Sequence, residues 1–197
     1  MPQFVSMLPG FDVFESDSSV VYCLDPDFKI SYCNAAWDRF AIENNGSKLK
    51  RPAPIGLRLE DYLRAPLLDF YFAAFEVVRN TGQPWHHVYE CSSPETVRRI
   101  HMRVSPAPGS AINSLLVVNS QIGEEPMRRT VCDPTPAIYR HENGFVKMCS
   151  GCRRTHRAID NVWDWVPKYV EEMPPKTTHG LCPLCVLDYL PREVFLE

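Results

Sequence analysis

Four cysteines near the end of the chain have the types and spacing of metal ligands. Cys149 and Cys152 form one Cys-x2-Cys pair, Cys182 and Cys185 form another, and 29 residues separate the two pairs. Zinc prefers four soft donors in a tetrahedron, with each sulfur about 2.3 Å from the ion, and each pair can deliver two sulfurs to one point. The spacing therefore predicts a closed four-cysteine zinc site that leaves no coordination position for hydrolytic chemistry.

The residues around these cysteines have the composition of a small core. Pro167 suits the first turn of a short helix, and Pro183 can begin another. The expected apolar side chains are Trp163, Trp165, Val166, Tyr169 and Val170 between the pairs, and Val186, Leu187 and Leu190 in the last helix. About 45 residues cannot readily build a self-sufficient core, whereas structural zinc contributes roughly 10–16 kcal/mol. We therefore expect an ion to hold together a module at residues 147–197, with Lys147, Arg153 and Arg154 offsetting the charge of the thiolates.

Three alternatives to a zinc site with four sulfurs remain open. Mononuclear iron in a rubredoxin-like site tolerates the same spacing, and the "CPLC" stretch is similar to the Cys-Pro-x-Cys loop of that family. Rubredoxins usually place Gly after each loop, however, where this chain has Arg153 and Val186. Redox-active dithiols are a second alternative. In a third, His179 replaces or supports a thiolate, whereas His156 is expected to be an exposed polar residue.

Length, composition and charge point to a globular protein with one ordinary domain and a smaller part. The chain has 197 residues, 45% of them hydrophobic and 23% charged, and its net charge is −3. This balance leaves no excess of basic residues that would favour binding to nucleic acid or to an anionic membrane. No apolar run is long enough to span a membrane. The start lacks the pattern of a signal peptide, so we expect a cytoplasmic protein whose remaining cysteines are free thiols. These are Cys23, Cys33, Cys91 and Cys132.

The first two thirds of the chain predict an α+β domain. Short β-rich runs flank an Asp-Pro-Asp turn and form a hairpin, and Asn34 can cap the helix that follows. A longer amphipathic helix precedes three successive strands. The expected ranges are 20–24 and 28–33 for the hairpin, 66–80 for the long helix, and 85–91, 97–105 and 112–121 for the three strands. This order indicates a five-stranded antiparallel sheet with helices on one face.

Residues 14–122 resemble the PAS domain family. The resemblance is carried by "VVYCLDPDFKISYCNAAWDRF" at residues 20–40 and by "NTGQPWHHVYECSSPETVRRIHMRVSPAP" at residues 80–108. It implies a sensory or interaction module whose helical side encloses a pocket. The expected organisation is a PAS-like domain with an N-terminal extension at 1–123, a linker at 124–146 that leads into a strand ending near Val146, and the four-cysteine module at 147–197.

The C-terminal stretch resembles a cysteine module that is appended to bacterial PAS and GAF sensor proteins. The resemblance covers residues 147–191 and implies a bacterial sensor protein. The matching residues are Cys149, Cys152, Arg154, Trp163, Tyr169, His179, Gly180, Cys182 and Cys185.

Haem and flavin are not expected in the PAS-like domain. His86 and His87 are neighbours on one predicted strand, so only one of them can face inward, and His101 lies on the next strand. Haem-binding relatives often use a histidine on the long helix, which has none here, and the flavin-photoreceptor motif with its reactive cysteine is missing. The aromatic residues are expected to form ordinary core, with a ligand cavity as the alternative. They are Tyr22, Trp37, Phe40, Phe70, Tyr71, Phe75 and Trp85.

These observations predict a non-enzymatic cytoplasmic sensor or signalling adaptor with a structural zinc site. No phosphate-binding glycine loop or catalytic serine motif is present. A redox or electron-transfer protein with a rubredoxin-like iron site is the alternative, and nucleic-acid binding by the zinc module is a third hypothesis that the local charge disfavours. Homodimerisation is expected through the N-terminal segment, unless its apolar residues simply pack on the sheet. These residues are Phe4, Val5, Leu8, Phe11, Val13 and Phe14. The sequence does not identify the signal, the ligand or the downstream partner.

Overall fold

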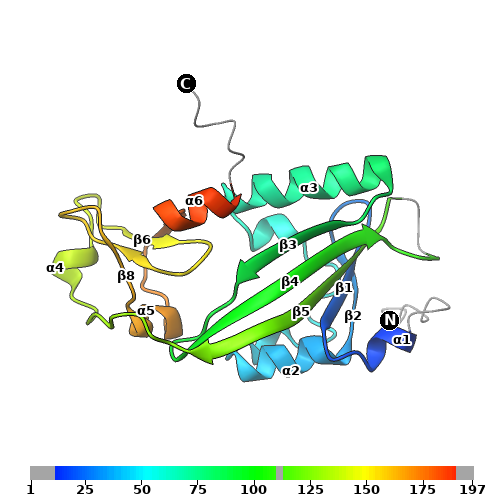
Figure 1. Cartoon of the computed structure of the whole chain (residues 1–197), viewed down its shortest axis with the longest axis horizontal. Helices are drawn as coiled ribbons and strands as arrows, with labels where there is room; N and C mark the ends of the chain where they lie inside the picture. The colour runs from blue at the N-terminus through cyan, green and yellow to red at the C-terminus, as the bar shows by residue number, and fades with distance from the viewer. Residues whose placement is uncertain (1–11, 110–112, 190–197) are drawn as a thin grey trace. The chain divides into compact units, whose positions relative to one another are not determined.

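The computed structural model describes residues 12–109 and 113–189. The helices are α1 (Asp12–Glu15), α2 (Ala35–Glu43), α3 (Leu67–Thr81), α4 (Pro136–Tyr139), α5 (Pro167–Glu171) and α6 (Pro183–Tyr189), with short 3-10 helices η1 (Ser47–Leu49) and η2 (Leu59–Asp61) (Figure 1). The strands are β1 (Val20–Leu24), β2 (Ile30–Cys33), β3 (Trp85–Glu90), β4 (Thr96–Pro106), β5 (Leu115–Pro126), β6 (Val146–Cys149), β7 (Thr155–His156), β8 (Trp163–Asp164) and β9 (Thr177–Gly180). No helix in these ranges has the length and apolar character needed to cross a bilayer.

Five strands form an antiparallel sheet in the order β2-β1-β5-β4-β3. Strand β1 pairs antiparallel with both β2 and β5, and α2 packs against β1. A second sheet has the order β8-β7-β6-β9, and its β6–β9 pairing is parallel. The predicted fold class is confirmed, because the chain combines a five-stranded antiparallel sheet and helices with a four-cysteine cluster near its end.

Two strand boundaries differ from those expected by more than three residues. Strand β5 continues to Pro126, beyond the expected end at residue 121. The strand expected to end near Val146 instead begins there. Both differences have the same physical reason, because strand length is decided by pairing with distant segments that local periodicity does not reveal.

The hairpin register separates two buried thiols. Cys33 lies opposite Tyr22, and Cys23 lies opposite Tyr32. Because neighbouring residues of a strand point to opposite faces, Cys23 and Cys33 lie on different faces of the sheet and do not face each other. All eight cysteines are free, and burial raises the pKa of Cys23 and of Cys33 to about 12.

Asn34 is a fully buried polar residue that joins the hairpin to α2. Its Oδ1 accepts hydrogen bonds from the N–H groups of Val21 (3.1 Å) and Trp37 (3.2 Å). Its Nδ2 donates to the carbonyl oxygens of Phe14 and Ser19, each at 2.9 Å. The predicted helix cap is therefore confirmed, and the same side chain also holds the segment between α1 and β1.

We expect Asn34→Ala to lower the free energy of unfolding by about 2–4 kcal/mol, because it removes a helix cap and leaves buried donors and acceptors without partners. Urea unfolding of the full chain, followed by circular dichroism, measures the change. Asn44→Ala is the matched control at the other end of α2, where one half-buried amide donates to Phe40 O at 2.8 Å. Equal losses for the two variants would contradict the proposed role of Asn34.

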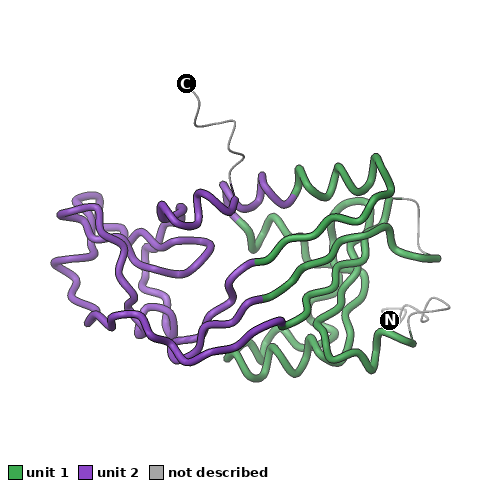
Figure 2. The backbone as a smooth tube through the Cα atoms, viewed as in Figure 1, with its two compact units in different colours: residues 1–63, 72–88, 100–121 green, residues 64–71, 89–99, 122–197 purple. Residues whose placement is uncertain are grey.

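The chain divides into two compact units (Figure 2). Unit 1 comprises residues 1–63, 72–88 and 100–121, and unit 2 comprises residues 64–71, 89–99 and 122–197. These units group residues that are close in space, and the expected domain boundaries at 123/124 and 146/147 stay a prediction. Unit 2 thus includes the beginning of α3 and the ends of β3 and β4 nearest their connecting turn, in addition to the C-terminal residues.

The expected N-terminal interface is only partly within the described residues. Phe4, Val5, Leu8 and Phe11 lie outside them. Val13 is exposed, whereas Phe14 packs against a cluster formed by Val21, Cys23 and Leu116. For Phe14 the alternative, packing on the sheet, is the one that the structure supports.

Candidate metal centre

The two cysteine pairs come together because β6 and β9 lie side by side. In the parallel register of these strands, Cys149 lies opposite Gly180, and Cys182 follows two residues later. Cys152 lies in the turn after β6, and Cys185 lies in the first turn of α6. The four Sγ atoms all lie within 4.8 Å of one another. The sequence prediction that these four residues converge is therefore met.

The geometry of the cluster suits a tetrahedral ion. Sulfurs that surround an ion at about 2.3 Å are separated from each other by about 3.8 Å. The Sγ atoms of Cys152 and Cys182 are 3.5 Å apart, close to that spacing. All four side chains are buried, the most accessible being Cys185 at 7%. The residues present thus fit a closed four-sulfur site.

The first cysteine pair depends on an unusual backbone. Arg153, directly after Cys152, has φ +62°, a left-handed conformation that usually favours glycine. Its N–H donates to Cys149 O at 3.0 Å, which closes the turn, and its Nη2 donates to Val170 O at 2.9 Å. The left-handed position is therefore occupied by an arginine whose side chain ties the turn to the end of α5.

Gly151, within the same turn, lies where no side chain fits. A Cβ atom at this position would lie 2.8 Å from Cys185 Sγ and 3.0 Å from Tyr189 Cε2. Both neighbours are buried, so neither can move away without disturbing the module. The close approach of the two cysteine pairs therefore requires glycine here.

Side-chain and backbone N–H groups donate to sulfurs of the cluster. Arg154 Nη1 lies 3.2 Å from Cys152 Sγ, and the backbone N–H of Cys182 donates to Cys149 Sγ at 3.3 Å. Hydrogen bonding between the two thiols lowers the pKa of Cys149 and raises the pKa of Cys152, so a thiolate at Cys149 is stabilised by a proton that Cys152 keeps until an ion replaces it. Of the three cations expected to offset the negative charge, Arg154 contacts a sulfur. Lys147 instead lies over the Trp163 ring, with its Nζ 5.7 Å from the centroid.

A second arginine supports the centre from the expected linker, and sequence reasoning missed it. Arg129 forms an ion pair with Glu90 and donates to Cys152 O at 3.5 Å. Its guanidinium also lies over the ring of buried Trp165, 4.9 Å from the centroid. These partners are far apart in the sequence, so no local motif marks Arg129 as part of the site.

Of the two histidines considered near the cluster, one differs from the prediction in its burial. His179 is exposed, and the cluster of candidate ligand atoms consists of the four cysteine sulfurs without a nitrogen of the His179 ring. His156, expected to be exposed, is buried with 8% of its surface accessible, so that prediction is wrong. The reason is that β7 lies between β6 and β8, where the imidazole packs edge-on against Trp163 with 4.9 Å between ring centroids.

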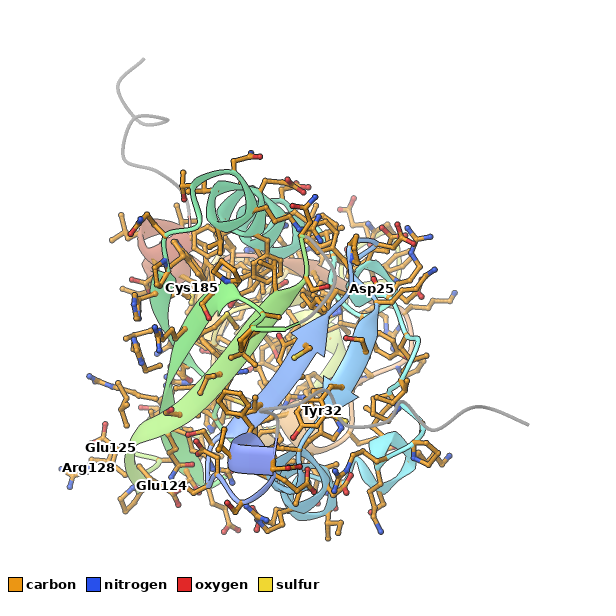
Figure 3. All side chains as sticks on the ribbon, turned by 90° about the vertical axis from the view of Figure 1, so that its right-hand side faces the viewer. Asp25, Tyr32, Glu124, Glu125, Arg128 and Cys185 are labelled. Atoms are coloured by element: carbon orange, nitrogen blue, oxygen red, sulfur yellow. The ribbon has the colours of Figure 1, made fainter. Side chains whose placement is uncertain are left out.

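We expect Arg154→Met to weaken metal binding about tenfold, because it removes a charged donor to a ligand sulfur while keeping an apolar side chain of similar length. Competition with a chromophoric chelator measures the affinity. Arg128→Met is the control, since the Arg128 side chain is exposed and points outward just after β5 (Figure 3). Equal affinities for the Arg154 variant and the unaltered protein would show that this hydrogen bond does not stabilise the centre.

The histidines considered for haem alternate as predicted. His86 is exposed and its Nδ1 lies 3.0 Å from His101 Nε2, whereas half-buried His87 stacks on Trp85. Among the aromatic residues, Tyr22, Tyr71 and Phe75 are buried. The expected absence of haem and flavin stays a prediction.

No protein-family model matches the chain, and no curated protein matches it. Solved structures similar to part of it include RsLOV D109G, with 14% identity and a TM-score of 0.42 over 57% of this chain and 65% of that chain. A LOV protein from Rhodobacter sphaeroides has 14% identity and a TM-score of 0.42 over 57% and 64% of the two chains. The PAS domain of nitrogen regulation protein NR(II) from Vibrio parahaemolyticus has 18% identity and a TM-score of 0.37 over 56% and 95%. The match spans less than two thirds of each LOV chain, and nothing about function follows from similarity this distant.

Proposed function

We propose that this protein is a non-enzymatic sensor or signalling adaptor in which a PAS-like domain binds a ligand or a partner and a structural zinc ion stabilises the C-terminal module. The proposal of a structural metal rests on four buried sulfurs from two Cys-x2-Cys pairs, which all lie within 4.8 Å of one another. A full set of four thiolates leaves no position for a catalytic water. The ion's role is therefore structural.

The sensor role is supported by the sequence resemblance and by the sheet. The resemblance to PAS domains covers residues 14–122, and the chain forms a five-stranded antiparallel sheet with helices. We propose that the protein is a cytoplasmic homodimer and that it transmits its signal to a downstream partner by direct protein contact. The net charge of −3 supports neither nucleic acid nor an anionic membrane as the partner.

Zinc is preferred over iron because of the second cysteine pair. Cys185 lies within α6, so the chain continues as a helix after this pair. A rubredoxin-like loop would instead be followed by glycine. Arg154 and Arg129 add positive charge near a centre whose four thiolates and one dication have a net charge of −2.

A mononuclear iron site is the second candidate, and one observation favours it. Arg153 adopts the left-handed conformation at the position where rubredoxin-like loops have glycine, so the first pair reaches the required geometry without glycine. Such a site would make the protein a redox or electron-transfer protein, because iron bound by four sulfurs changes oxidation state whereas zinc does not.

Metal analysis and native mass spectrometry of the full chain, purified without added metal, test the proposal. One zinc per chain, no visible absorption and a dimeric mass are expected. One iron per chain with a visible thiolate-to-iron band would instead favour electron transfer. A chain that binds no metal with all thiols reduced would contradict both candidates, and a monomer would contradict the proposed homodimer.

A further inference from the structure

Four of the six histidines form two pairs with almost the same geometry. His86 Nδ1 lies 3.0 Å from His101 Nε2, and His156 Nδ1 lies 3.2 Å from His141 Nε2. In each pair the ring centroids are 5.1 Å apart, and the ring planes differ by only 12° and 16°. Each pair can therefore share one N–H···N hydrogen bond, with one neutral imidazole donating and the other accepting.

The two pairs differ in burial. The pair of His86 and His101 is exposed, so water can solvate additional charge. In the other pair His156 is buried, with β7 paired to β6 and β8 and the ring against Trp163. Additional positive charge on this pair is not readily solvated.

Charged groups around His156 oppose its protonation. Lys147 on β6 and His141 after α4 add positive charge, while Asp160 in the loop before β8 offsets part of it and Asn161 hydrogen-bonds to the ring. Burial, followed by Lys147 and His141, lowers the pKa of His156 below its usual value. When the neutral pair takes up one proton, the resulting imidazolium can still donate a hydrogen bond to the neutral ring. A second added proton removes this hydrogen bond, because two imidazolium cations then lie in contact.

The charged neighbours on the same hairpin do not supply a free counter-ion. Arg157 pairs with both Asp160 and Asp164, and Asp164 also accepts a hydrogen bond from Tyr139 Oη at 2.7 Å. These contacts already engage both carboxylates. A second proton on the histidine pair therefore meets little compensation.

The position of His156 connects this chemistry to the metal centre. Strand β7 contains Thr155 and His156 and pairs with β6 through Thr155 and Met148. Strand β6 ends at Cys149, the first residue of the cysteine cluster. Separation of the two imidazoles would therefore loosen β7 next to the strand that positions the first cysteine pair.

We propose that the His141–His156 pair is a pH-sensitive latch that makes metal retention by the C-terminal module depend on mild acidification. The usual histidine pKa is about 6.5, and His156 has a lower value in the folded chain. Between these values the unfolded chain binds more protons, so the free energy of unfolding falls as pH falls. The stabilisation is complete above the unfolded value and is lost as pH decreases through the folded one. The proposal rests on the proposed metal site and adds its regulation.

The test compares metal affinity at pH 7.5 and pH 5.5 in the full metal-loaded chain, using competition with a chromophoric chelator. Protonation of the cysteine ligands weakens binding in every variant, so the informative quantity is the difference between variants. We expect affinity to fall about tenfold more in the unaltered protein than in His156→Gln, because only the unaltered protein has the buried imidazole that takes up a proton when the module opens. His101→Gln, in the exposed pair, is the matched control and should follow the unaltered protein.

Imidazole NMR of the unaltered metal-loaded chain provides a readout that needs no variant. His156 should titrate below the usual histidine value of about 6.5, and its resonances should report a proton shared with His141. An identical pH dependence in His156→Gln and the unaltered protein, or a His156 titration at about 6.5, would overturn the proposal. If His156→Gln fails to fold, His141→Gln and the NMR titration decide the matter. Absence of metal at pH 7.5 would instead refute the proposed metal site.

Discussion

Cys182→Ser is expected to abolish stable metal binding and to unfold the C-terminal module, while unit 1 remains folded. Cys182 contributes one of four clustered sulfurs, and its backbone N–H donates to a second, Cys149 Sγ. Removing one ligand forfeits a large part of the roughly 10–16 kcal/mol that structural zinc contributes. Metal content and hydrogen–deuterium exchange of the purified full chain measure both effects.

The exchange pattern makes this prediction specific. Buried Tyr189 of α6 packs edge-on against Phe70, with ring centroids 5.2 Å apart, so the first turn of α3 should lose protection together with β6, β9 and α6. Chelation of the ion from the unaltered protein should give the same pattern. Cys132→Ser is the matched control, because Cys132 is a half-buried free thiol of the same unit outside the cluster. A Cys182→Ser protein with full metal content and normal protection would show that the sulfurs do not hold an ion.

Gly151→Ala is expected to disrupt the centre without removing any ligand. The added methyl group would lie 2.8 Å from Cys185 Sγ and 3.1 Å from Cys185 Cβ, distances that force the cysteine or the turn to move. Overpacking of a close-packed interior usually costs about 1–3 kcal/mol, and here the displaced atom is also a metal ligand. We therefore expect a clear drop in thermal stability together with metal affinity reduced at least about tenfold.

Gly123→Ala is the control for this substitution. Its nearest neighbour would be Arg99 Cβ at 4.0 Å, an ordinary contact, and Gly123 lies within β5 in the same unit. This variant should bind metal normally and unfold at or slightly above the original temperature. If Gly151→Ala behaves in the same way, the turn is more adaptable than the structure indicates.

Much of the architecture was predictable from local chemistry. Asn34 before α2, Pro167 in the first turn of α5 and Pro183 at the start of α6 all occupy the positions expected of their types. These residues act through neighbours within one turn, so their effect is visible in the sequence. The last helix confirms the prediction as far as Tyr189, and Leu190 lies outside the described residues.

The residues that sequence reasoning missed or misplaced act across long separations. Arg129 reaches Glu90 across 39 residues, and Trp165 Nε1 donates to Pro94 O across 71 residues. The sequence predicts an exposed polar residue at His156, whereas its side chain is buried. Its burial follows from the pairing of β7 with β6 and β8, which no periodicity in a two-residue strand can indicate.

The sequence by itself determined which atoms can bind an ion, since the number and spacing of the cysteines specify two turns that each present two sulfurs. It also determined the alternation of strands and helices, because side-chain periodicity follows directly from backbone geometry. Only the tertiary structure decided how the site is closed. The parallel pairing of β6 with β9, the absence of space beside Gly151 and the burial of His156 all arise from segments distant along the chain, whose packing depends on shape and volume that a local pattern does not specify.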